Sequence, residues 1–130
     1  MARLIADTHA IVWHLTAPRK LGAAARRRFD AADAARALVC VPAIALVEIA
    51  LLHERGRLAV GVDEVLEALA GQPGYAVLAL DAEQAAAFAG LAGMKDPMDR
   101  LIVAAARATL SPVLSVDAAL DGFGVERIWD

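Results

Sequence analysis

Four acidic residues of the sequence stand at positions suited to binding a divalent metal ion: Asp7, Glu48, Asp99 and Asp117. Two of them directly follow short apolar runs, one interrupts a long apolar stretch, and one lies at the start of a helical pattern. Carboxylates that come close together raise one another's pKa and need cations to stay ionised. An all-oxygen ligand set without a cysteine or histidine cluster is what Mg²⁺ or Mn²⁺ prefers. Because such ions activate water and position a phosphodiester, the four acids point to phosphoryl chemistry.

Each acid also has a purely structural explanation. Asp7 and Asp117 each precede a predicted helical segment, where an aspartate serves as the N-cap. Asp99 lies in the first turn of a helix, where an acid interacts favourably with the helix dipole. Glu48 lies two turns into its helix, and burial among apolar neighbours is costly for a carboxylate unless an arginine or a metal ion neutralises it. An arginine partner and a metal ion are both possible explanations for Glu48.

The segment that contains Asp99 begins a helix with two aspartates. Asp96 suits the N-cap and Pro97 the first helical position, so one acid is enough to cap the helix. Asp99 then occupies the third helical position, one turn further in. We therefore expect Asp96 to hold the helix end and Asp99 to face the metal.

Strands that alternate with helices are expected to position these acids. The sequence predicts strands at 3–6, 38–41, 75–80, 113–116 and 125–128, and helices at 8–17, 23–35, 42–54, 62–70, 82–91 and 97–110, with a helical turn at 117–120. Continuously apolar strands indicate an α/β fold whose parallel sheet is covered on both faces. Sites in such folds collect at the carboxyl ends of the strands. The helix 42–54 is apolar nearly all round, which predicts burial of most of its surface.

Length and composition indicate one globular domain spanning residues 1–130. Although 59% of the residues are hydrophobic, no apolar run reaches the ~18 residues that a membrane span requires. The first residues do not show the pattern of a secretory signal peptide. The single cysteine, Cys40, excludes an intramolecular disulfide and is expected to be a buried strand thiol. We expect a cytoplasmic protein with no membrane contact.

The net charge of −3 argues against a protein that grips nucleic acid over a broad basic face. Much of the positive charge is nevertheless clustered in the first half of the chain, at Arg19, Lys20, 26–28, Arg55 and Arg57. These clusters are also explained as solvated helix faces.

Several motifs together carry a resemblance to a known family. They are Asp7-Thr8-His9 with Trp13, Val47-Glu48-Ile49, Asp96-Pro97-Met98-Asp99-Arg100-Leu101-Ile102 with Ala105, Leu114-Ser115-Val116-Asp117, and Ile128-Trp129. In order and spacing they resemble the PIN-domain ribonucleases, and most nearly the VapC toxins of bacterial type II toxin–antitoxin pairs. Asp-Pro-x-Asp-Arg is the most specific piece. The resemblance covers nearly the whole chain and implies a three-layer α/β/α sandwich around a parallel sheet of about five strands.

The resemblance also implies an activity. It implies Mg²⁺- or Mn²⁺-dependent cleavage of RNA that leaves 5′-phosphate and 3′-hydroxyl ends, frequent homodimerisation, and inhibition by a VapB-type antitoxin. The acidic residues of the family fall on Asp7, Glu48, Asp99 and Asp117, which would be both metal ligands and catalytic residues. Thr8 and Ser115 match the hydroxyl residues beside the first and last acids and are expected to support them or to orient water. Ser115 stands where the family often has threonine, and Met98 replaces a commoner phenylalanine; neither change puts the chemistry in doubt.

Further residues of these motifs have less specific expectations. Arg100 is expected to pair with a neighbouring acid rather than to contact RNA phosphate. Trp13 and Trp129 are expected in the core or at a dimer interface rather than as base-stacking platforms. Any part of the apolar helix that the core leaves uncovered, at Leu46, Val47, Ala50 and Leu51, would offer a surface to a second copy or to the antitoxin.

Two alternative functions remain open at this point. One is a haloacid-dehalogenase-like phosphatase with Asp7 as the nucleophile, although such an enzyme expects a second aspartate at the position of His9. The other is a degenerate PIN-like binding module without catalysis, in which the acids serve only as caps and ion pairs.

Overall fold

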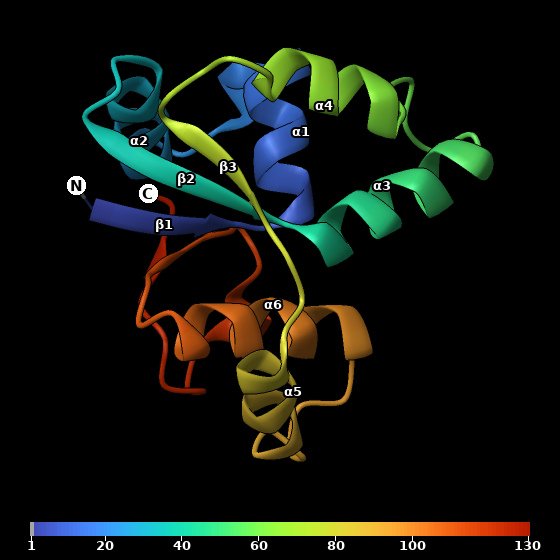
Figure 1. Cartoon of the computed structure of the whole chain (residues 1–130), viewed down its shortest axis with the longest axis vertical. Helices are drawn as coiled ribbons and strands as arrows, with labels where there is room; N and C mark the ends of the chain where they lie inside the picture. Colours follow the sequence, from blue (N-terminus) through green and yellow to red (C-terminus); the bar gives the residue numbers. More distant parts are fainter. Residues whose placement is uncertain (1) are drawn as a thin grey trace.

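A parallel sheet of five strands forms the middle layer of the molecule (Figure 1). The computed structural model describes residues 2–130. The strands are β1 (Ala2–Ala6), β2 (Ala37–Pro42), β3 (Tyr75–Leu78), β4 (Val113–Leu114) and β5 (Arg127–Ile128). Their order across the sheet is β3-β2-β1-β4-β5, which places the first strand at the centre. In the register, Leu4 pairs with Val39 on one side of β1, and Ile5 pairs with Val113 on the other.

Helices cover both faces of the sheet (Figure 1). The segments α1 (Thr8–Thr16), α2 (Ala23–Asp33) and α4 (Val62–Leu69) lie on one face, and α5 (Ala82–Ala89) and α6 (Pro97–Ala108) lie on the other. Two 3₁₀ turns, η1 (Pro18–Lys20) and η2 (Ala118–Leu120), follow α1 and β4. The expected α/β/α sandwich is confirmed. Within residues 2–130 no helix is long and apolar enough to cross a membrane.

Helix α3 (Ala43–Glu54) occupies a separate position, because it continues from the carboxyl end of β2 and projects away from the sheet (Figure 1). It contacts α1, α4 and α6. Only Ala45 and Ile49 are buried, whereas Val47 is 56% exposed and Leu51 40% exposed. The prediction that most of this helix is buried is therefore wrong. The helix has more apolar side chains than its contacts with the rest of the domain cover.

Burial within the sheet also decreases from its central strand to its edge. Leu4, Ile5 and Ala6 of the central strand are completely buried, because strands and helices surround them. Within residues 2–130 the edge strand β3 pairs only with β2, and its Ala76 and Val77 are exposed. Cys40 is buried in β2, as expected, and its burial raises the pKa of the thiol. Strands β3 and β4 end two residues earlier than predicted, and β5 begins two residues later than predicted.

Candidate active site

Asp7 and Asp117 lie at the carboxyl ends of neighbouring parallel strands. Asp7 follows β1 and caps α1, since its Oδ1 accepts a hydrogen bond of 2.8 Å from the Thr8 N–H. Asp117 follows the β4 segment and caps η2, since its Oδ1 accepts a 2.9 Å bond from the Ala119 N–H. Because β1 and β4 are adjacent and parallel, both caps lie at the same edge of the sheet. The capping explanation is thus correct for both residues, and it also brings the two acids together.

Ser115 links these two acids. Its hydroxyl donates a 2.7 Å hydrogen bond to Oδ2 of Asp7, and its Oγ accepts a 3.0 Å bond from the Asp117 N–H. The serine is only 1% exposed, so water does not compete for these bonds. Burial raises the pKa of Asp7, while the bonds from Ser115 and Thr8 act in the opposite direction and the nearby charge of Glu48 raises the pKa further.

Asp96 caps α6 as predicted. Its Oδ1 accepts bonds from the N–H groups of Met98 and Asp99, at 2.9 and 3.1 Å, and Pro97 occupies the first helical position. The cap leaves the side chain of Asp99 for another role. It also brings a second negative charge close to Asp99, because the two aspartates are three residues apart at the same helix end.

Asp99 is the electrostatic centre of the acid site, a name we use for Asp7, Glu48, Asp99 and Asp117. Burial raises its pKa to about 7, and the charges of Asp96, Asp117, Asp7 and Glu48, in that order, contribute to the increase. An acid after β1, an acid in α3, the N-cap of α6 and an acid after β4 therefore act on one carboxyl group. A half-buried aspartate that is partly protonated near neutral pH lacks a compensating cation.

No arginine neutralises Glu48: the ion pairs within residues 2–130 join other residues, His14 with Asp33 and Arg127 with Asp121. The acids nevertheless do not form a finished coordination shell. Among the described residues, no group of three or more Asp, Glu, His or Cys side chains lies close enough together to hold one ion. The structure thus brings the charges of the acid site together, and the assignment of its residues as metal ligands stays a prediction.

Thr8 offers a further polar atom beside Asp7. The residue is 1% exposed, and its Oγ1 has no hydrogen-bond partner within the described part of the chain. Buried hydroxyl groups are nearly always hydrogen-bonded in native proteins. An unsatisfied buried hydroxyl beside Asp7 is therefore a place where a bound water would be stabilised.

Comparison with known proteins agrees with this geometry. A family model described as the PIN domain matches residues 4–125. The chain belongs to the PIN domain family. The fold of this PIN domain resembles that of VapBC2 from Rickettsia felis, solved with a DNA fragment from its promoter, at a TM-score of 0.73 and 12% identity over 98% of this chain and 99% of that chain.

Two further solved structures are similar to this PIN domain. FitAcB from Neisseria gonorrhoeae matches at a TM-score of 0.64 and 21% identity, covering 95% of each chain. A toxin–antitoxin complex from Klebsiella pneumoniae matches at a TM-score of 0.65 and 14% identity, covering 93% of this chain and 92% of that one. A comparison with curated proteins gives no match.

Arg100 of the PIN domain does not pair with an acid. Its Nε donates a 2.9 Å hydrogen bond to the carbonyl oxygen of Phe88, and its guanidinium lies over the Phe88 ring at 4.0 Å from the centroid. The expected ion pair is wrong, because the α5 segment presents a ring and a carbonyl to the guanidinium. Arg100 ties α5 to α6 and leaves the negative charge of the neighbouring Asp99 uncompensated.

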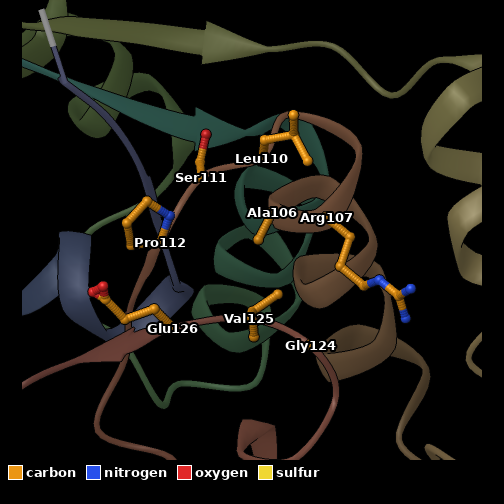
Figure 2. A pocket seen from close by; sticks show the side chains of 8 residues that line it. All are labelled: Ala106, Arg107, Leu110, Ser111, Pro112, Gly124, Val125 and Glu126. Atoms are coloured by element: carbon orange, nitrogen blue, oxygen red, sulfur yellow. The ribbon is translucent and has the colours of Figure 1, made fainter.

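A surface pocket of about 490 Å³ lies away from the acid site (Figure 2). Ala106 and Val125 are among the residues that line it, Ser111 and Pro112 precede β4, and the side chain of Arg107 extends away from the other labelled side chains. The pocket is next to the amino end of β4, whereas Asp7 and Asp117 lie at the carboxyl edge. It is therefore not part of the candidate active site.

Proposed function

We propose that this PIN domain is a metal-dependent endoribonuclease and the toxin of a toxin–antitoxin pair. The observation that carries the proposal is the convergence of carboxylates on Asp99, whose pKa they help to raise to about 7. A protein gains little stability from gathering uncompensated acids, so the arrangement is best explained by a cation that neutralises them.

The donor chemistry of the acid site suits Mg²⁺ or Mn²⁺, and binding would draw its carboxylates closer together than they lie in this structure. The donors are carboxylate oxygens, which these ions prefer, and Asp7 is already oriented by Ser115 and by the Thr8 N–H. Such an ion, when bound, supplies Lewis acidity toward a water molecule and a phosphodiester. The chain itself orients the Asp7 carboxylate through Ser115 and the Asp117 carboxylate through the Ala119 N–H, and its unsatisfied Thr8 hydroxyl is available to a buried water.

The toxin role is supported by the fold, by the charge of the acid site and by the surface of α3. The fold resembles a chain of a toxin–antitoxin complex. The acid site would also attract a basic segment of an antitoxin, which would compete with the metal and the substrate. The exposed apolar side chains of α3, Val47 and Leu51, support a homodimer or an antitoxin contact at that helix.

The direct test is cleavage of single-stranded RNA in Mg²⁺ or Mn²⁺ by the wild type and by Asp7→Asn and Asp99→Asn. We expect both variants to lose cleavage, while Asp63→Asn, the same change at an exposed position of α4, keeps it. We expect products with 5′-phosphate and 3′-hydroxyl ends. Undiminished cleavage by Asp7→Asn or Asp99→Asn would overturn the proposal.

A non-catalytic binding module is the second candidate, because no three acids are close enough to hold an ion in the described residues. Isothermal titration of the wild type and Asp99→Asn with Mn²⁺ separates the two. A nuclease should release or absorb heat that the substitution removes, whereas a module without a metal site should show no difference. Absence of phosphate release from small phosphomonoesters is expected, and its presence would favour the phosphatase alternative.

A further inference from the structure

An aromatic surface begins beside the acid site. His9 is exposed in the first turn of α1, two residues after Asp7, and its charge affects the pKa of Asp7. Trp13 lies one turn further along the same side of the helix, with the two ring centroids 5.6 Å apart. Trp13 is only partly buried, while Trp129 behind it, at 5.8 Å between ring centroids, is 8% exposed. The core expectation thus holds for Trp129, whereas Trp13 reaches the surface.

A lysine side chain lies next to Trp13 on this surface. Lys20 of η1 lies with its Nζ 5.6 Å from the centroid of the Trp13 ring. His9, Trp13 and Lys20 therefore form a continuous row, which we call the aromatic–basic strip. The strip leads from the acid site toward the basic residues of η1.

The backbone around η1 is held in place by close contacts. Gly22 follows the turn, and a Cβ added there would lie 2.2 Å from the carbonyl oxygen of Trp129. The same oxygen accepts a 3.0 Å bond from the Ala25 N–H. Arg26 donates a 2.8 Å bond from Nη2 to the carbonyl oxygen of Pro18. Lys20 is consequently presented by a fixed turn, which reduces the entropy lost when it binds a ligand.

The cations of this surface are available to a polyanion. Arg19, Lys20 and Arg26 are exposed, and none of them takes part in an ion pair within residues 2–130. The acid site repels phosphates, and the net charge of the chain is −3. A polyanion that reaches the acid site therefore needs local compensation, and the strip supplies it next to Asp7.

We propose that His9, Trp13 and Lys20 hold a single-stranded RNA segment beside the acid site, with Lys20 binding a phosphate and the two rings contacting a base. Aromatic side chains next to cations are the combination that binds single strands without strict sequence preference. The proposal rests on the ribonuclease function proposed above and states where the substrate strand lies.

The experiment measures RNA binding separately from cleavage. The full chain is titrated in EDTA against a fluorescein-labelled oligouridine of about 12 nucleotides, and anisotropy is followed at several salt concentrations. The variants are Lys20→Gln and His9→Ala, two exposed positions. Arg36→Gln is the matched control. Arg36 is an exposed cation just before the amino end of β2, whereas Asp7 follows the carboxyl end of β1.

We expect Lys20→Gln to weaken binding and to lower the slope of log K against log salt by about 0.7, the value for one phosphate contact on a single strand. His9→Ala should weaken binding about fivefold or more through lost stacking. Arg36→Gln should leave both quantities near the wild-type values. Circular dichroism and thermal unfolding confirm that each variant is folded.

Two results contradict the inference in different ways. If the wild type binds and cleaves RNA but Lys20→Gln and His9→Ala bind it like Arg36→Gln, the strip assignment is wrong and the ribonuclease function stands. If the wild type neither binds nor cleaves RNA, both the strip and the proposed function are wrong.

Discussion

The hydroxyl of Ser115 donates a 2.7 Å hydrogen bond to the carboxylate of Asp7, although the two residues are 108 positions apart in the chain. The bond crosses from the end of β4 to the end of β1, and the same Oγ accepts a bond from the Asp117 N–H. One small buried side chain therefore sets the orientation of the first acid of the site and the backbone of the last.

Replacing Ser115 by alanine should lower metal-dependent RNA cleavage about 10- to 100-fold, the usual effect of removing a group that orients metal ligands. Ser115→Thr, which keeps the hydroxyl, should restore most of the activity. Ser111→Ala is the control, because Ser111 is also buried but its hydroxyl bonds to the Thr109 carbonyl at the other end of β4. Cleavage rates per folded molecule test the prediction, and equal rates for Ser115→Ala and Ser111→Ala would contradict it.

The two aspartates that begin α6 should separate stability from activity. Asp96→Ala removes two capping bonds and should reduce the free energy of unfolding by about 0.5–2 kcal/mol. Asp99→Asn should instead abolish most cleavage while leaving the cap intact. Urea unfolding and a cleavage assay on both variants check these separate roles. A larger loss of cleavage in Asp96→Ala than in Asp99→Asn would contradict the prediction.

The metal-free protein should become less stable as the pH rises toward neutrality. The pKa of Asp99 is raised from 3.8 to about 7 in the fold, so folding favours its protonated form. That contribution is fully present below the ordinary aspartate pKa and is lost as pH rises through about 7. For a half-exposed group the loss is about 1 kcal/mol once solvent screening is considered.

Urea unfolding in EDTA at several pH values measures this loss, with Asp99→Asn as the reference. The variant has no charge to develop at that position, so it should be the more stable protein above neutral pH. Added Mg²⁺ or Mn²⁺ should restore stability to the wild type but not to the variant. A wild type and variant with parallel pH profiles would show that Asp99 does not experience the repulsion described here.

Arg100 should contribute to stability rather than to catalysis. Arg100→Lys keeps the charge but loses the bond to the Phe88 carbonyl and the stacking on its ring, at a cost of about 1–2 kcal/mol. Arg107→Lys, an exposed arginine of the same helix, should cost little. Thermal unfolding compares the two, and a loss of cleavage without a loss of stability in Arg100→Lys would indicate an RNA contact instead.

The fold and the position of the acids were accessible from the sequence because local signals determine them. Apolar runs ended by Asp7 and followed by a helix predict both the strand and the cap, and Asp96 with Pro97 predicts the start of α6. Parallel strand order then brings the carboxyl ends to one edge without further information.

The remaining features depend on contacts that no local pattern reveals. The apolar composition of α3 does not show that only Ala45 and Ile49 are buried. Arg100 has acids near it in sequence, but the ring that it contacts belongs to Phe88, on the preceding helix. Lys20 reaches Trp13 through a 3₁₀ turn that the sequence pattern did not predict.

The central position of β1 has a consequence for how the protein is made. Strand β1 is completed on one side by β4, whose residues are synthesised more than a hundred positions after those of β1. Until then Asp7 has neither Ser115 nor Asp117 beside it. A chain still under translation therefore has no complete acid site, and any activity begins only after synthesis has passed β4.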